Sequence, residues 1–303
     1  MKNLFKKNTI IFLGLILALL LTGVTQYRTN TRVASPNPKP RTLTTVADFP
    51  SIFQVSDKTK SVLPESSPIP KNAVVLQTLE RDLYGDNHIQ NIVLYMQKDD
   101  GGFPVSLHLM VNGVEKVSTK LAEGYTLGTL GFENLDNDQT DEVLVYQNCT
   151  GSSGAALLDI YEPSGNRWQH IFSAPNTDEN HIDMIYSVKY IGDYQVRFID
   201  KQTGLTGTIT LDEKNYRGWE ADLTKITTWV DPISHYIFKD LDSDQYQEVI
   251  AVQGVFGLCH PDLIAELLTT FKKVNGTYQP IIQTLTAPCD RTGQGKPLAE
   301  VHY

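Results

Sequence analysis

One short acidic segment occurs twice in this chain, and it limits the possible folds more than any other feature of the sequence. The pattern Phe-x-Asn/Asp-Leu-Asp-x-Asp occupies residues 132–138 and 238–244, and each copy is followed three residues later by Glu-Val and an apolar run. A run rich in β-branched residues directly after a polar segment is typical of a strand. Each acidic segment is therefore predicted to be a loop that joins two strands.

A weaker copy of the loop begins at Asp82, and the spacing of the copies indicates an internal repeat. The loops begin at Asp82, Asn134 and Asp240, at intervals of 52 and 106 residues. The second interval is about twice the first, so a shortened copy is expected near 187–193, where Tyr190-Ile191-Gly192-Asp193 stands. A period near 50 residues with several strands per unit predicts a propeller-like array. An irregular sandwich with chance similarity among its turns is the alternative.

The remainder of the chain after residue 72 also reads as short strands between turns. Asn275-Gly276 is the strongest type of hairpin signal, and Ser164-Gly165-Asn166 is a second turn. Residues 262–271 also fit a helix, but we favour a strand there. The other predicted strands are Asn91–Met96, Val105–Val111, Glu142–Tyr146, Ala155–Tyr161, Tyr186–Ile191, Gln195–Ile199 and Glu248–Val252. We therefore expect an all-β domain over residues 73–303, a propeller-like array of small antiparallel sheets in about four quasi-repeats.

The N-terminus has the layout of an export signal. Lys2, Lys6 and Lys7 precede an apolar run over residues 10–21, which is a basic region followed by a hydrophobic one. We predict a hydrophobic helix over residues 1–27, a signal sequence or, as we favour, an uncleaved membrane anchor. Residues 28–72 read as a linker rich in Pro and Thr. The body would then lie outside the cytoplasm, membrane-anchored or secreted.

The charge of the body excludes one class of partner. All 35 acidic residues lie in 48–303, against 19 basic residues there, which gives that region a net charge of −16. An acidic body repels phosphate backbones, so no nucleic acid partner is expected. The same charge favours the binding of cations.

The two strong loops carry oxygen ligands at alternate positions. Side chains at positions 1, 3 and 5 of a tight loop can converge on one point, the carbonyl of position 7 adds an oxygen, and a carboxylate at position 9 completes the shell of a hard divalent cation. The predicted calcium ligands are Asp240, Asp242, Asp244, Tyr246 and Glu248 in one loop, and Asn134, Asp136, Asp138, Thr140 and Glu142 in the other. The ion would be a structural Ca²⁺.

These loops differ from a helix–loop–helix calcium site, which needs a carboxylate at position 12 and glycine at position 6. Position 12 is Val145 or Ala251, and position 6 is Gln139 or Gln245. In the weaker loop, Tyr84 and Gln90 replace the carboxylates of positions 3 and 9. We expect that loop to be a structural turn without an ion.

The two strong copies resemble the FG-GAP/VCBS type of repeat, as found in the β-propellers of integrin α chains. The resemblance lies in residues 132–138 and 238–244 with the Glu-Val and strand that follow, and weaker copies extend it over most of residues 73–290. It implies propeller blades with calcium in the inter-strand loop, in proteins that often serve extracellular adhesion. The missing glycine at position 6 is a departure from the family's pattern, and it bears on metal affinity.

Known catalytic patterns are not found in the sequence. None of the seven histidines has a partner at metal-site spacing, and no nucleophile elbow, phosphate loop or dinucleotide fingerprint is present. We therefore lean away from an enzyme. Of the three cysteines, Cys259 and Cys289 are the preferred disulfide pair, which leaves Cys149 unpaired.

Together these observations predict an extracytoplasmic, calcium-stabilised binding or scaffolding module, suited to cell-surface adhesion or envelope association. Its ligand would be a protein or a glycan, and its N-terminal helix would contact the membrane. Two alternatives remain open: an extracytoplasmic hydrolase acting on polysaccharide, and an accessory subunit of a cell-envelope complex.

Overall fold

The computed structural model describes residues 69–303 except 152, 166, 176–181 and 289–294. The chain divides into two units, Met1–Val62 and Leu63–Tyr303, and all the described residues belong to the second. The predicted anchor over residues 1–27 and nearly all of the predicted linker lie outside the described residues. Among the helices of the described part, none has the length and apolar character needed to cross a bilayer.

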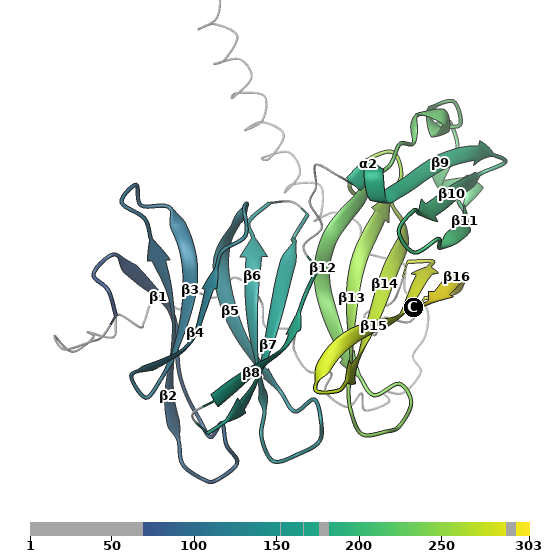
Figure 1. Ribbon diagram of the computed structural model, residues 1–303. Helices are drawn as coiled ribbons and strands as arrows, with labels where there is room; N and C mark the ends of the chain where they lie inside the picture. The colour runs from purple at the N-terminus through teal and green to yellow at the C-terminus, as the bar shows by residue number, and fades with distance from the viewer. Residues whose placement is uncertain (1–68, 152, 166, 176–181, 289–294) are drawn as a thin grey trace, which may run out of the picture. The chain divides into compact units, whose positions relative to one another are not determined.

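The described residues form an all-β structure of four antiparallel sheets, as predicted (Figure 1). The first and second sheets each have four strands in sequence order. The first sheet consists of β1 (Ala73–Arg81), β2 (Gln90–Lys98), β3 (Pro104–Val111) and β4 (Val114–Lys120). The second consists of β5 (Tyr125–Glu133), β6 (Glu142–Cys149), β7 (Ala156–Ser164) and β8 (Arg167–Ser173).

The third and fourth sheets differ from this pattern in size. The third has three strands, β9 (Tyr186–Gly192), β10 (Gln195–Asp200) and β11 (Thr206–Thr210), with β10 in the middle. The fourth has five strands: β12 (Val230–Lys239), β13 (Glu248–Phe256), β14 (Leu263–Val274), β15 (Thr277–Thr286) and β16 (Pro297–His302). Three single-turn helices precede β9 or β12: α2 (Ile182–Ile185), η3 (Glu213–Tyr216) and η4 (Asp222–Lys225).

The predicted turns occur where hairpins were expected. Val274 pairs with Thr277 across the Asn275-Gly276 turn, and both turn residues have positive φ, 52° and 84°. Two consecutive left-handed residues form the turn whose twist matches that of the strands. Ser164 likewise pairs with Arg167. Residues 263–274 form a strand, as we favoured over a helix.

The packing of the sheets does not follow their order in the sequence. One hydrophobic core joins the first sheet to the second, and another joins the second to the fourth. The third sheet shares its core with the fourth. Along β13, Val249 and Ala251 belong to the core shared with the second sheet, whereas Val255 belongs to the core shared with the third. The central strand β13 is buried at all its positions, which explains its uninterrupted apolar run.

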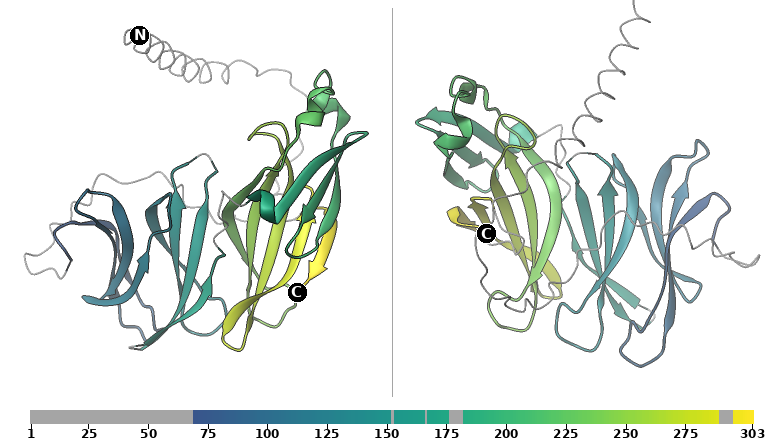
Figure 2. Two further views of the ribbon diagram at one scale, coloured as in Figure 1. Left: turned by 45° about the horizontal axis from the view of Figure 1, so that its top comes forward. Right: turned by 180° about the vertical axis from the view of Figure 1, so that it is seen from behind.

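The interval of 106 residues therefore has a different origin from two successive repeats. It contains β6, β7 and β8 of the second sheet, then the third sheet and β12. Among the described residues, the third sheet packs against the fourth and shares no core with the second (Figures 1 and 2). The turn expected to be a shortened acidic loop joins β9 to β10, and Gly192, Asp193 and Tyr194 have positive φ there. In space, the acidic loops belong to three sheets that are consecutive neighbours: the first, second and fourth.

Candidate metal centre

Each acidic loop joins the first and second strands of its sheet and is closed by the side chain at its ninth position. That side chain is buried and accepts a hydrogen bond from the backbone N–H of the second position. The three bonds are Leu83 N to Gln90 Oε1 (2.7 Å), Leu135 N to Glu142 Oε2 (2.7 Å) and Leu241 N to Glu248 Oε2 (2.8 Å). The ninth residue therefore has a structural role in addition to any role as a ligand, and the sequence-based interpretation missed it.

A second shared feature is a left-handed backbone at position 4. Gly85, Asn137 and Ser243 occupy this position with φ of 62°, 58° and 65°. Our sequence interpretation considered only position 6, where Gln245 does adopt φ 75°. Left-handed backbone disfavours residues other than Gly, Asn and Asp, so the Asp240 loop holds two residues in costly conformations.

In the first loop, the carboxylate of Asp82 accepts hydrogen bonds from the backbone of its own loop. Its Oδ1 accepts from the N–H groups of Tyr84 and Asp86, and its Oδ2 accepts from that of Asn87 at 2.8 Å. Such bonds from an aspartate to following amides form an Asx-type turn.

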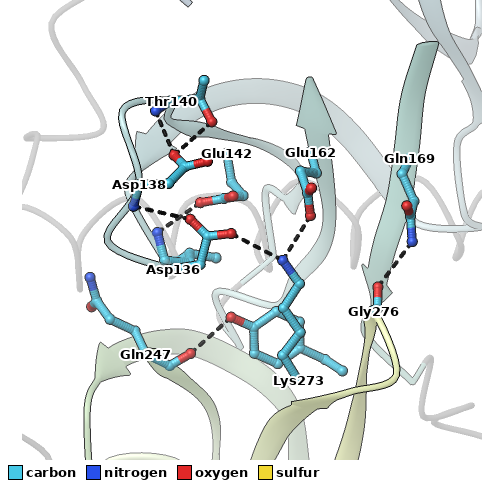
Figure 3. A network of polar contacts seen from close by, with 11 residues as sticks. Asp136, Asp138, Thr140, Glu142, Glu162, Gln169, Gln247, Lys273 and Gly276 are labelled. Carbon is cyan, nitrogen blue, oxygen red and sulfur yellow. Dashed lines mark hydrogen bonds and ion pairs between the residues drawn. The ribbon is translucent and has the colours of Figure 1, made fainter. Parts of the chain in front are cut away.

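The Asn134 loop brings together two of its predicted ligands, Asp136 and Glu142, whereas a third, Asp138, makes other contacts (Figure 3). Asp136 and Glu142 lie together with Glu162, and one carboxylate oxygen of each lies within 4.8 Å of the others. Asp138 instead accepts from Thr140, at 2.5 Å from its N and 2.8 Å from its Oγ1. Glu162 stands on β7 and was not predicted, because no sequence spacing relates it to the loop.

Two oxygen atoms of this loop are buried and lack a hydrogen-bond partner among the described residues: Asn134 Oδ1 and Glu142 Oε1. Glu142 is fully buried. Burial raises its pKa to about 7, although the Leu135 N–H opposes the rise. An unpartnered buried carboxylate oxygen costs free energy, and a cation bound by that oxygen would remove this cost.

A lysine of the fourth sheet enters the same cluster. Lys273 Nζ lies 2.7 Å from Glu162 Oε2 and 3.3 Å from Asp136 Oδ2, and only 13% of its side chain is exposed. Its ammonium supplies positive charge to the acidic group, as Figure 3 shows.

The Asp240 loop has the same plan in a more exposed form. Asp240, Asp242 and Asp244 each place an oxygen within 4.8 Å of the others, and all three are exposed. Lys272 Nζ contacts Asp242, lies 2.7 Å from Asp244 Oδ2 and lies 3.6 Å from Glu248 Oε1. The hydrogen bond from Lys272 lowers the pKa of Asp244. The lysine thus contacts three of the predicted calcium ligands.

The two predicted carbonyl ligands lie at these loops, and their N–H groups are engaged there. Thr140 donates to Asp138, and Tyr246 donates its N–H to Asp244 Oδ1 at 2.9 Å. The loops also contact each other across the sheets. Gln247 donates from its N to Leu135 O (2.7 Å) and from its Nε2 to Asn134 O (2.8 Å). The fourth sheet thereby holds the backbone of the Asn134 loop.

A different polar chain lies on the first sheet and has no counterpart in the sequence-based predictions. Ser106 Oγ lies 2.8 Å from His108 Nε2, and His108 Nδ1 lies 2.9 Å from Glu115 Oε2. Tyr95 stacks on the imidazole and donates to the same carboxylate oxygen at 3.1 Å. The signal in the sequence is only Ser-x-His on one strand, which places both side chains on the same face.

Cys149 and Cys259 are free thiols in the structure. Cys289, the predicted partner of Cys259, lies outside the described residues. His260 does not pair with the neighbouring Asp262 that the sequence offers: its Nε2 lies 2.9 Å from Asp231 Oδ2, while Asp262 accepts from the Tyr216 hydroxyl.

Comparison with known proteins gives a match to part of the chain. A family described as the YybI C-terminal domain matches residues 184–286, about a third of the chain. The matched region contains the third sheet and most of the fourth, with the Asp240 loop, but not the Asn134 loop. No curated protein and no solved structure matches the chain.

Proposed function

We propose that this chain is an exported, calcium-stabilised binding or scaffolding module, anchored to a membrane or secreted, with calcium held by its acidic loops. The observation that carries the proposal is the pair of buried oxygens without partners, Asn134 Oδ1 and Glu142 Oε1, at positions 1 and 9 of one loop. These are two of the positions that a calcium loop of the FG-GAP/VCBS type uses. The donor set is made of oxygens only, which suits a hard cation.

The same interpretation extends to the architecture. The first, second and fourth sheets act as successive blades of a propeller-like array, with the third sheet inserted between the second and the fourth in sequence. Support comes from the two shared cores and from the position of an acidic loop between the first two strands of each of these sheets. The ligand of such a module would be a protein or a glycan, at a cell surface or as an accessory subunit of an envelope complex.

Calcium should stabilise the fold measurably. For a Kd near 1 mM, calcium at about ten times that concentration adds about 1.4 kcal/mol, which corresponds to a rise in Tm of roughly 3–6 °C. Thermal melts with calcium, with EDTA and with sodium chloride of equal ionic strength measure the effect. A variant with Asp136→Asn, Asp240→Asn, Asp242→Asn and Asp244→Asn is the control and should lose it. Coincident melts of the wild type with calcium and with EDTA would show that the proposal is wrong.

One observation, the chain Ser106–His108–Glu115, favours a hydrolase of another class than a two-carboxylate glycosidase, namely an acyl hydrolase that would cleave ester groups, for example on a polysaccharide. The order of contacts among these three residues, hydroxyl to Nε2 and carboxylate to Nδ1, is that of a nucleophile, a general base and an orienting carboxylate. A hydrolase of this kind forms an acyl-enzyme at the serine. A fluorophosphonate probe should then label the wild type, and neither Ser106→Ala nor His108→Gln. Equal labelling of the wild type and Ser106→Ala, or no labelling, rejects this alternative.

A further inference from the structure

Two consecutive lysines on β14 form ion pairs with two different acidic loops. Lys272 contacts Asp242, Asp244 and Glu248 of its own sheet, whereas Lys273 contacts Asp136 and Glu162 of the second sheet. Successive side chains of a strand point to opposite faces, which is how neighbouring residues reach separate loops. The ammonium of Lys273 is the more enclosed of the two, with 13% of the side chain exposed against 25% for Lys272.

The oxygens around Lys273 form a set that the loop sequence does not assign. Asp138, at position 5, is engaged by both donors of Thr140. Glu162, from the neighbouring strand β7, takes its place beside Asp136 and Glu142. Two side chains of the same loop, Asn134 and Glu142, each have a buried oxygen without a hydrogen-bond partner among the described residues.

We propose that Lys273 is the exchangeable counter-ion of a divalent cation site formed by Asn134, Asp136, Glu142 and Glu162. A calcium-sized cation entering this site displaces the ammonium from Asp136 and Glu162. The inference rests on the calcium-binding function proposed above, and it specifies the ligands and the competitor at one of the two loops.

Exchange follows from the geometry of the contacts. A bound Ca²⁺ requires its oxygens at 2.3–2.6 Å, and Lys273 already holds two of them at 2.7 and 3.3 Å. Two cations that shared these oxygens would repel each other strongly at such short range. One of them must therefore leave.

A cavity beside Lys273 can accommodate the displaced ammonium. This cavity of about 280 Å³ is lined by Asp136, Asp244, Tyr246, Lys273 and Gly276. Lys273 itself lines this cavity, so its side chain can turn into it and leave the oxygens that the cation takes. Lys273 forms ion pairs between the second and fourth sheets. When a cation binds at the Asn134 loop, these ion pairs are replaced by contacts of the cation with oxygens of the second sheet.

The test is calcium titration by calorimetry in the full-length chain, with the other loop neutralised by Asp240→Asn, Asp242→Asn and Asp244→Asn. In this background Lys273→Met should raise calcium affinity about tenfold or more, because it removes a competing charge at equal volume. Lys272→Met is the matched control and should leave the affinity unchanged. Glu162→Gln should lower the affinity about tenfold or more, and Asp138→Asn should leave it within about twofold.

The outcomes separate this inference from the proposed function. If Asp138→Asn abolishes binding while Glu162→Gln and Lys273→Met leave it unchanged, calcium uses the loop ligands alone; the exchange is wrong and the calcium function stands. If no variant binds calcium in this background, Lys273→Met included, the site at the Asn134 loop is wrong; if the unaltered chain does not bind calcium either, the calcium function itself is wrong. Should Lys273→Met fail to fold, the contrast between Glu162→Gln and Asp138→Asn decides alone.

Discussion

The ninth residue of each acidic loop shows how one side chain can combine two tasks. Glu142 and Glu248 each use one carboxylate oxygen to accept the N–H of the second loop residue, and Gln90 does the same with its amide oxygen. An amide therefore suffices for the structural task. The second oxygen distinguishes the loops: in Glu142 it is buried without a partner among the described residues, and in Glu248 it lies 3.6 Å from Lys272. Only a carboxylate adds the negative charge that a cation needs.

Two histidines should give the stability of the protein opposite dependences on pH. The hydrogen bond to Asp159, 2.9 Å from His170 Nε2, raises the pKa of His170, whereas burial lowers the pKa of His235. The raised pKa of His170 adds stability that is fully present below the ordinary value of about 6.5 and is lost as the pH rises through the folded pKa. The lowered pKa of His235 removes stability as the pH falls below about 6.5.

Urea unfolding of His170→Gln and His235→Gln at about pH 5.5 and about pH 8.5 tests these signs. The loss of stability caused by His170→Gln should be larger at the acidic pH. For His235→Gln it should be smaller at the acidic pH, because the wild type then carries the cost of protonating a buried imidazole. The same change with pH in both variants would contradict the assignment.

At the scale of elements, the loops also fix how the first and second sheets meet. Arg81 Nε, at the end of β1, donates to Asp141 Oδ2 of the Asn134 loop at 2.9 Å. Gly85, at position 4 of the first loop, is close to the same loop: a Cβ on this residue would lie 2.3 Å from Gln139 O. The left-handed backbone and the close approach both require glycine there.

Gly85→Ala should therefore destabilise the protein by more than its backbone conformation explains. Gly113 is the matched control, because its φ is +77° and a Cβ there meets nothing within 4 Å. Gly113→Ala should cost about 1–2 kcal/mol from the left-handed backbone alone. Gly85→Ala should cost clearly more, because the Gln139 backbone must shift. Equal urea midpoints for the two variants would show that the close approach of Gly85 to Gln139 does not affect the stability.

At the scale of the whole molecule, the three sheets with acidic loops form one series of packed neighbours, and the third sheet lies outside that series. The first, second and fourth sheets carry the acidic loops and pack in that order. The third sheet packs against the fourth through Val196, Phe198 and Ile209. The family match over residues 184–286 covers this pair of sheets and ends before β16. The matched region thus contains most of the hydrophobic interface between the third sheet and the fourth, which β16 completes, and one acidic loop.

The sequence by itself determined the elements whose signals are local. Alternating and β-branched runs gave the strands, Asn275-Gly276 gave its hairpin, and the acidic pattern placed its loops between strands. These features depend on residues near one another in the chain, so periodicity and turn chemistry suffice to find them.

Only the tertiary structure decided what lies beside each loop. Glu162 and Lys273 reach the Asn134 loop from strands that no spacing relates to it, and Thr140 turns Asp138 away. The sequence also could not predict the position of the third sheet, because the spacing of the loops does not distinguish a shortened repeat from an inserted sheet. The physical reason is the same in each case: cation charge and apolar cores are shared between segments far apart in sequence, and folding alone brings those segments together.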